Sequence, residues 1–289
     1  MTIQFLFTGL TTGAIYALIA IGFCVVHNAT GIVNFAQVDF VTLGGMLLYT
    51  FLHQAGLPMW LDFPLTVVGV ALIGGLLERL TLRPARSDQV LILIFITIGA
   101  SILLRGGMEH VWGRSSLAVR PISLGEPLEV LGAAMMPQSL WVMALTGFCV
   151  AVLTWYFRRT RPGKAMRAVA DNPKAASLVG IDVAWMKTLA FAISGGVGAL
   201  AGMLIVPITT LAYDVGVMIG LKGFAAAVLG GYGHFLGAIL GGLALGVVES
   251  MGAGLISSTY KDVIAFVILL LVLFLRPSGL LGTGAGERV

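Results

Sequence analysis

Residues 158–187 read RRTRPGKAMRAVADNPKAASLVGIDVAWMK and separate two long apolar runs of the chain. The stretch contains seven of the 17 Lys and Arg residues, against two acidic residues. Because Lys and Arg accumulate in the cytoplasmic loops of membrane proteins, we expect this stretch to lie on the cytoplasmic side. Its basic residues are Arg158, Arg159, Arg161, Lys164, Arg167, Lys174 and Lys187.

The same stretch predicts two short helices in tandem. Thr160 is a suitable N-cap for the first helix. Asp171 or Asn172 ends that helix and is able to cap a second one, which Pro173 opens and Gly180 ends. Two hypotheses stay open: a rigid basic element on which a partner protein acts, or a basic loop that only fixes the topology. Topology alone requires positive charge but not two capped helices.

The composition predicts an integral membrane protein. Hydrophobic residues make up 58% of the 289 residues and charged residues 10%, whereas soluble domains contain about 25% charged residues. Only helices and closed barrels span a bilayer, and the apolar runs here are continuous rather than alternating. We therefore expect an all-α polytopic membrane protein with one transmembrane domain over residues 1–289. Its basic balance comes from cytoplasmic loops and not from a nucleic-acid interface.

The apolar runs predict about eight or nine membrane helices or half-helices. We assign the basic loop 78–88 to the cytoplasmic side, and alternation of sides from this loop places the N-terminus outside. The C-terminus then lies inside, provided that residues 216–233 cross the membrane. The arginines that assign these sides are Arg79, Arg83, Arg86, Arg276 and Arg288. The expected spans are 4–26, 40–53, 64–80, 90–104, 140–157, 188–207, 219–229, 235–256 and 263–275.

Glycine accounts for 39 residues, well above the ~7% of average proteins. In a membrane this abundance favours close helix packing through small residues four positions apart. The pairs with this spacing are Gly9/Gly13, Gly198/Gly202, Gly237/Gly241 and Gly242/Gly246.

Residues 105–137 form the longest segment that we assign to the non-cytoplasmic, periplasmic side. VRPISL (119–124) and PLEVLG (127–132) are β-like pieces on either side of a turn. They predict a small external hairpin.

Residues 27–40, HNATGIVNFAQVDF, are too polar to face lipid. Irregular backbone at this depth is tolerated where it is buried in protein or lines a cavity. Asn34, Gln37 and Asp39 are therefore candidates for a translocation path or a break between helices. The alternative is that Asp39 only caps the helix that follows it.

Three further ionisable residues fall in the apolar C-terminal part. Glu249 is expected to face the bundle interior, where it forms an interhelical hydrogen bond or lines the path. Lys222 and His234 flank a glycine-rich break. We expect neighbouring carbonyl groups to bind them, and the alternative is a functional role, as for any ionisable group at membrane depth.

The sequence contains no pattern for catalysis, cofactor binding or metal binding. It has no G-x-x-x-x-G-K-[ST], H-E-x-x-H or G-x-S-x-G motif, and its four His residues are scattered. The acids in the apolar runs are few and isolated, which disfavours a proton relay. We therefore expect that energy enters at residues 158–187 from a partner that hydrolyses nucleotide.

Four blocks of the sequence carry a family resemblance. They are GIVNFAQVDFVTLGG (31–45), GKAMRAVADNPKAASLVGID (163–182), KGFAAAVLGGYGHFLGAILGGLALGVVE (222–249) and FLRPSGLLG (274–282). Together they resemble the permease subunits of branched-chain amino acid ABC importers, of the LivH type, over essentially the whole chain.

The resemblance implies the type II ABC importer permease fold in a bacterial inner membrane. The implied partners are a second permease in a heterodimer, two cytoplasmic ATPase subunits and a periplasmic solute-binding protein. It also implies that GIVNFAQ lies near the central path and that the second short helix is an ATPase-coupling helix. The coupling residues would be Pro173, Lys174, Ala175, Ala176, Leu178, Val179 and Gly180.

Two alternatives to a branched-chain amino acid importer stay open at this point. The same importer type serves other amino acids, and related systems take urea or short-chain amides. A different class is a secondary transporter or channel that works alone through glycine-broken helices at the midplane. That class requires ion-coupling residues, for which Glu249 and Asp39 are the candidates.

Overall fold

The computed structural model describes residues 2–85, 89–123, 125–130, 132–276 and 278–282. Two of the arginines that assign membrane sides, Arg86 and Arg288, lie outside the described residues. Leu124 and Leu131, from the expected hairpin, lie outside them as well.

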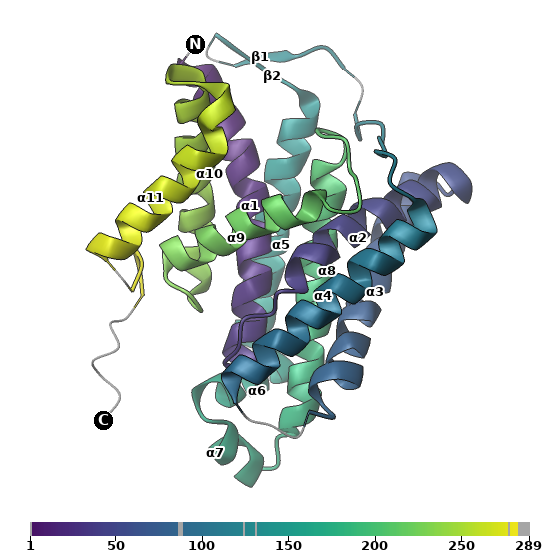
Figure 1. Ribbon diagram of the computed structural model, residues 1–289, viewed down its shortest axis with the longest axis vertical. Helices are drawn as coiled ribbons and strands as arrows, with labels where there is room; N and C mark the ends of the chain where they lie inside the picture. The colour runs from purple at the N-terminus through teal and green to yellow at the C-terminus, as the bar shows by residue number, and fades with distance from the viewer. Residues whose placement is uncertain (1, 86–88, 124, 131, 277, 283–289) are drawn as a thin grey trace.

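The described chain is almost entirely helical, which confirms the predicted fold class (Figure 1). Two π-helical turns, η1 (Thr50–Gln54) and η2 (Glu78–Leu82), extend the second and third helices, and a 3-10 turn, η3 (Ser258–Tyr260), precedes the last. The α-helices are α1 (Thr2–Thr30), α2 (Gln37–Tyr49), α3 (Met59–Leu77), α4 (Val90–Trp112), α5 (Pro137–Arg159), α6 (Arg161–Asp171), α7 (Pro173–Leu178), α8 (Val183–Ile205), α9 (Val215–Gly230), α10 (Phe235–Leu255) and α11 (Lys261–Leu275).

Seven helices in the described part of the chain are long and apolar enough to cross a membrane. They are α1, α3 with η2, α4, α5, α8, α10 and α11 with η3. The shorter α9 and the α2–η1 pair supply two further apolar elements, so the expected eight or nine are present.

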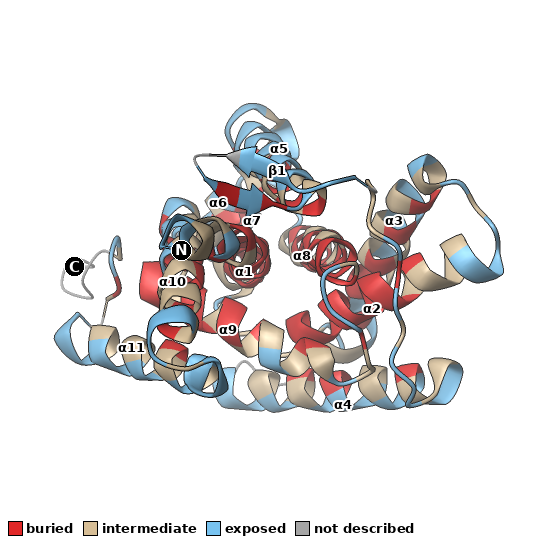
Figure 2. Cartoon of the chain, turned by 90° about the horizontal axis from the view of Figure 1, so that it is seen from above, coloured by how far each residue is buried: buried red, intermediate tan, exposed pale blue. Residues whose placement is uncertain are grey.

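Two helices form the centre of the molecule. The most apolar windows of α1 and α8 are 89% and 78% buried, whereas those of α4 and α11 are 17% and 6% buried. Seen from above, α1 and α8 are surrounded by α2, α9 and α10, while α3, α4, α5 and α11 lie at the periphery (Figure 2). The peripheral helices expose large apolar side chains, as expected for surfaces in contact with lipid or another subunit.

Glycine contacts explain why α1 and α10 approach so closely. A Cβ atom added at Gly9 would lie 2.6 Å from the Val247 Cα atom, and one at Gly13 would lie 2.8 Å from the Leu243 Cα atom. Gly242 and Gly246 of α10 meet the backbone of α1 in return. Gly198 and Gly202 pack against α2, and Gly237 and Gly241 against α9, so the four predicted pairs all lie at helix contacts.

The two ends of the molecule differ in the elements that they carry. The N-terminus lies at one end with the hairpin of β1 (Leu128–Val130) and β2 (Ala133–Met135), whereas α6 and α7 lie at the opposite end (Figure 1). Asn28, near the C-terminal end of α1, donates a hydrogen bond to the Gly233 carbonyl over 2.9 Å. The shorter apolar helix α9 is not among the seven long helices of the described chain, so the expected crossing by residues 216–233 stays a prediction.

The expected external segment is corrected in two respects. The helix α4 continues to Trp112, so the non-helical part begins at residue 113 and not at 105. The expected strand pairing is also wrong, because Leu128–Val130 pairs with Ala133–Met135 in antiparallel register. Residues 119–124 form no strand where they are described.

Candidate coupling element and translocation path

The basic stretch forms the two capped helices that its sequence predicts. The Thr160 hydroxyl accepts a hydrogen bond from the Gly163 amide over 3.1 Å at the start of α6. The Asn172 side chain accepts one from the Ala175 amide over 3.0 Å at the start of α7, so Asn172 rather than Asp171 is the second cap. Gly180 has a φ of 84°, the left-handed conformation that favours glycine after a helix.

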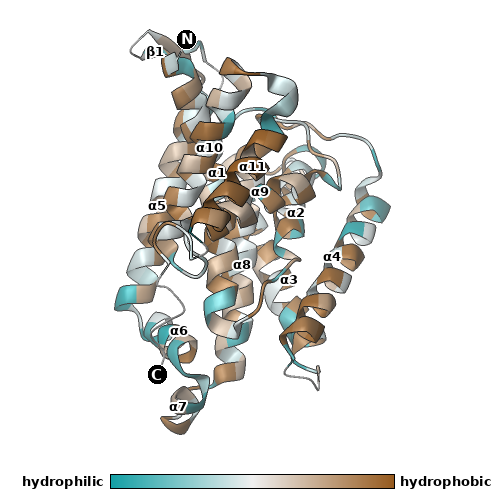
Figure 3. Cartoon of the chain, turned by 60° about the vertical axis from the view of Figure 1, so that its left-hand side comes forward, coloured by the Kyte–Doolittle hydropathy of each residue, from teal (hydrophilic) through white to brown (hydrophobic). Residues whose placement is uncertain are grey.

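One side of this element is anchored and the other is free. Met166 and Val169 of α6 and Ala176 of α7 are buried against the bundle. In contrast, Leu178 and Val179 are 88% and 77% exposed. The element forms the far end of the molecule, where α6 is hydrophilic and α7 shows a hydrophobic stretch (Figure 3). An exposed apolar tip is typical of a surface that binds another protein.

The polar segment between α1 and α2 is a buried break. The Asn34 side chain accepts a hydrogen bond from the Ala36 amide over 3.1 Å, and Asn34 and Gln37 have no exposed surface. Gln37 bonds to Ser194 of α8 through its side chain, and Ser194 donates to the Gly22 carbonyl of α1 over 2.9 Å. These contacts join α1, α2 and α8 at the point where α2 begins.

Asp39 does not cap α2. The N-cap position belongs to Ala36, and Asp39 lies within the first turn. Its carboxylate accepts hydrogen bonds from Ser101 and, over 3.3 Å, from the Arg105 Nε atom, both on α4. The alternative of a simple cap is therefore wrong, because the carboxylate is used to hold α4 against α2.

Glu249 lies in an ionic cluster, defined here as Tyr16, Lys222, Glu249 and Asp262, of which all but the 40% exposed Asp262 are buried. The Lys222 ammonium group lies 2.6 Å from a Glu249 oxygen and 2.5 Å from an Asp262 oxygen. Tyr16 donates a hydrogen bond to Glu249 over 2.8 Å. The expected interhelical hydrogen bond of Glu249 is confirmed. The expectation that carbonyl groups bind Lys222 is wrong, and so is the description of the buried acids as isolated.

Two buried acids were not singled out from the sequence. Asp62, at the start of α3, has no exposed surface and accepts a hydrogen bond from Thr66 over 3.0 Å. Glu78, at the other end of α3, is 3% exposed and accepts one from Thr188 over 2.6 Å. Their position at the predicted ends of a span made them resemble ordinary interfacial residues. Among the described residues, no group of three or more His, Cys, Asp and Glu could hold a metal ion.

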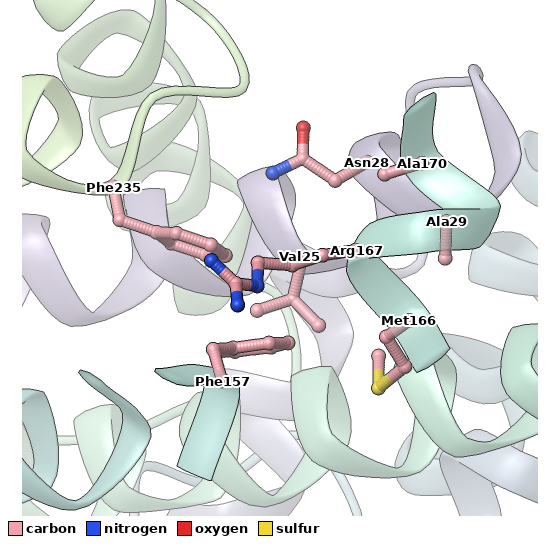
Figure 4. Close-up of a pocket in the computed structure, with 8 residues that line it drawn as sticks. All are labelled: Val25, Asn28, Ala29, Phe157, Met166, Arg167, Ala170 and Phe235. Atoms are coloured by element: carbon pink, nitrogen blue, oxygen red, sulfur yellow. The ribbon is translucent and has the colours of Figure 1, made fainter. Parts of the chain in front are cut away.

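Two neighbouring cavities lie where α1 ends above α6 and α7. The smaller, of about 30 Å³, is lined largely by apolar side chains (Figure 4). In it the Arg167 guanidinium of α6 points toward Phe235 and Phe157, whose rings stack with centroids 5.0 Å apart. The larger, of about 260 Å³, is more polar and is lined by His27, Asn28, Ala29, Thr30, Gly31, Val169, Ala170, Pro173 and Lys187.

Comparison with known proteins gives a consistent result along the chain. Residues 5–273 match the family described as branched-chain amino acid transport system / permease component. The chain is 34% identical to the high-affinity branched-chain amino acid transport system permease protein LivH of Salmonella typhimurium, over 99% of this chain and 97% of the relative. It is also 34% identical to the permease protein BraD of Pseudomonas aeruginosa, over 99% and 98% of the two chains.

A solved structure supports the architecture. PsaBC from Streptococcus pneumoniae, solved in complex with a Fab, matches with a TM-score of 0.50 and 14% sequence identity. The match covers 95% of this chain and 93% of the other. At this identity the likeness concerns the fold alone.

Proposed function

We propose that this chain forms the membrane path of an ATP-driven importer for branched-chain amino acids. The premise is that the chain belongs to the family of permease components of branched-chain amino acid transport systems. The family consists of transport components and not of enzymes. The chain is a multi-pass permease subunit of the inner membrane. The named substrate of the 34% identical relatives supports branched-chain amino acids over urea or other solutes.

The proposed assembly contains subunits beyond this chain. An ABC importer of this family requires ATPase and binding-protein components. We propose that this chain pairs with a second permease, that two ATPase subunits contact its cytoplasmic end, and that a periplasmic binding protein contacts the end with the hairpin. The exposed apolar flanks of the peripheral helices leave surface for a second permease.

The exposed tip of α7 is the observation that carries the proposal. Leu178 and Val179 are apolar, lie at the basic end of the molecule and contact little of their own chain. The helix α7 follows the hydrophilic α6 at the far end of the molecule, so a groove on another protein is the environment that we propose for these side chains. Residues 173–180 are therefore proposed as the coupling helix, with α6 holding it rigidly against the bundle.

The polar breaks are proposed to adjoin the path. Asn34 and Gln37 lie where irregular backbone is buried among α1, α2 and α8, as is expected next to a path. Asp39 and Glu249 are held by Arg105 and Lys222, so we assign them to shaping the path and not to carrying ions across it.

Substitution of Leu178 by Gln tests the coupling helix. Burial of a Leu side chain in a groove contributes about 1.5–3 kcal/mol, so we expect the affinity for the ATPase subunit to fall by about 10- to 100-fold. Binding of the purified ATPase to membranes containing the permease measures this affinity, and uptake of labelled leucine should fall in parallel.

The matched control is Leu80→Gln, since Leu80 is also exposed, on η2 at the same end of the molecule. We expect this variant to bind the ATPase as the unmodified chain does. Equal effects of the two substitutions, or none from Leu178→Gln, would remove α7 as the coupling helix.

A further inference from the structure

The larger cavity at the cytoplasmic end adjoins the proposed coupling helix, and the proposed function assigns no ligand to its interior. It lies between the last turn of α1, the end of α6, the start of α7 and the start of α8. Its volume of about 260 Å³ is slightly below the ~300–1,000 Å³ typical of pockets for drug-sized ligands. The cavity therefore suits one small metabolite.

One wall of the cavity supplies hydrogen-bond acceptors. The last three residues of α1 are Asn28, Ala29 and Thr30, and none of their carbonyl groups accepts a hydrogen bond from a described residue. A helix C-terminus carries a partial negative charge, so these carbonyl groups favour a cation.

The lining of the cavity also supplies a cation. Lys187 of α8 lines the cavity and forms no ion pair with a described residue. An ammonium group in this position favours a carboxylate or a phosphate. A phosphate would at the same time face the free carbonyl groups of α1, which repel it. A ligand with one positive and one negative end satisfies both the carbonyl groups and the ammonium group.

We infer that this cavity binds a free α-amino acid from the cytoplasm. Its ammonium group is placed against the carbonyl groups that end α1, and its carboxylate against Lys187. Val169 and Ala170 offer apolar contacts to a branched side chain. This inference rests on the proposed function, because it takes the ligand to be the transported amino acid.

The site has a consequence for transport because Pro173, the first residue of α7, lines it. A bound amino acid contacts α1, α6, α7 and α8 together. It therefore stabilises the conformation seen here, in which α7 is positioned so that the cavity is formed. A ligand that binds one state better than the others shifts the population toward that state. Cytoplasmic substrate thereby slows further uptake, as feedback from the product side.

The test uses the complete transporter, with both permeases, the ATPases and the binding protein, in proteoliposomes that contain ATP. The initial rate of labelled leucine uptake is measured with and without millimolar unlabelled leucine inside. For the unmodified chain we expect internal leucine to lower the rate by about fivefold or more, the range of ordinary allosteric coupling. The readout is the ratio of the two rates within each variant, so a change in basal uptake cancels.

Lys187→Ala should bring this ratio close to one, and Ala170→Leu should do the same by filling the cavity without changing charge. Lys164→Ala, which removes an exposed charge from α6 outside the cavity, should leave the inhibition intact. Inhibition that persists in both cavity variants, or that internal phosphate produces and leucine does not, overturns the inference. Absence of any uptake without internal leucine instead contradicts the proposed function, so the two failures are distinguishable.

Discussion

Lys222 is a buried charged residue at membrane depth, and two acidic side chains make its charge tolerable. The side chains of Lys222 and Glu249 are 7% and 8% exposed, and Asp262 adds a second carboxylate from α11. The sequence indicated that Glu249 faces the interior, but it did not identify its partner. The pairing joins α9, α10 and α11, so it depends on tertiary packing that no local pattern encodes.

A double substitution tests this pairing. Breaking a buried ion pair by removing one partner costs about 3–5 kcal/mol, because the other charge remains unpaired. We expect Lys222→Met to lower the free energy of unfolding by about this amount, and addition of Glu249→Gln to restore a large part of it. Thermal unfolding of Lys222→Met, Glu249→Gln and the double variant in detergent measures the coupling. Additive effects of the two substitutions would show that Lys222 and Glu249 do not act as a pair.

At the scale of elements, local signals identified the helices well and the hairpin poorly. The caps of α6 and α7 were readable because Thr160, Asn172 and Gly180 act within a few residues of their own position. The hairpin was misplaced because its second strand is fixed from a distance. Gln4 of α1 both donates to the Ala134 carbonyl, over 2.7 Å, and accepts from its amide, over 2.9 Å.

The start of α2 shows a similar limit. The composition of residues 27–40 predicted a buried break, and the structure contains one. The contacts of Gln37 with Ser194 and of Asp39 with Arg105 were not predictable, since each joins segments more than 60 residues apart. The composition thus located the candidate path residues in a buried segment, whereas their contact partners are visible only in the folded structure.

Glycine substitutions test the close contact of α1 and α10. Gly13→Ala places a methyl group 2.8 Å from the Leu243 Cα atom, and overpacking of this kind costs about 1–3 kcal/mol. A Cβ atom added at Gly147, in the exposed middle of α5, has no atom within 4 Å. Because Ala favours a helix over Gly, Gly147→Ala should raise the free energy of unfolding by up to about 1 kcal/mol. We expect the midpoint of thermal unfolding to fall for the first variant and not for the second. Equal midpoints would mean that α1 moves away from α10 at little cost.

At the scale of the whole molecule, the described charged side chains lie at the ends, in buried ionic contacts or in hydrogen bonds to hydroxyl groups. The basic element lies beyond one end, and the two ionic contacts at membrane depth are Lys222 with its two acids and Arg105 with Asp39, within the described residues. Asp62 and Glu78 bond to hydroxyl groups instead. They are therefore the groups on which a gradient-driven mechanism would have to depend.

The separation of these two acids argues against such a mechanism. Asp62 and Glu78 lie 16 positions apart on one helix, which corresponds to about 24 Å at 1.5 Å per residue. The intervening residues of α3 contain no titratable side chain, so a proton relay along this helix lacks intermediate steps. This separation is consistent with the proposal that the energy for uptake arrives through α7 from ATPase subunits.

Reconstitution of this chain alone tests that conclusion. In vesicles with an imposed proton or sodium gradient, we expect no accumulation of leucine above its passive equilibrium. The complete transporter in matched vesicles, with ATP, should accumulate leucine, and it should continue to do so with Asp62→Asn or Glu78→Gln, because neither acid carries the driving ion. Accumulation by the chain alone that disappears with either substitution would identify it as a secondary transporter, and the exposed tip of α7 would then need another partner to explain it.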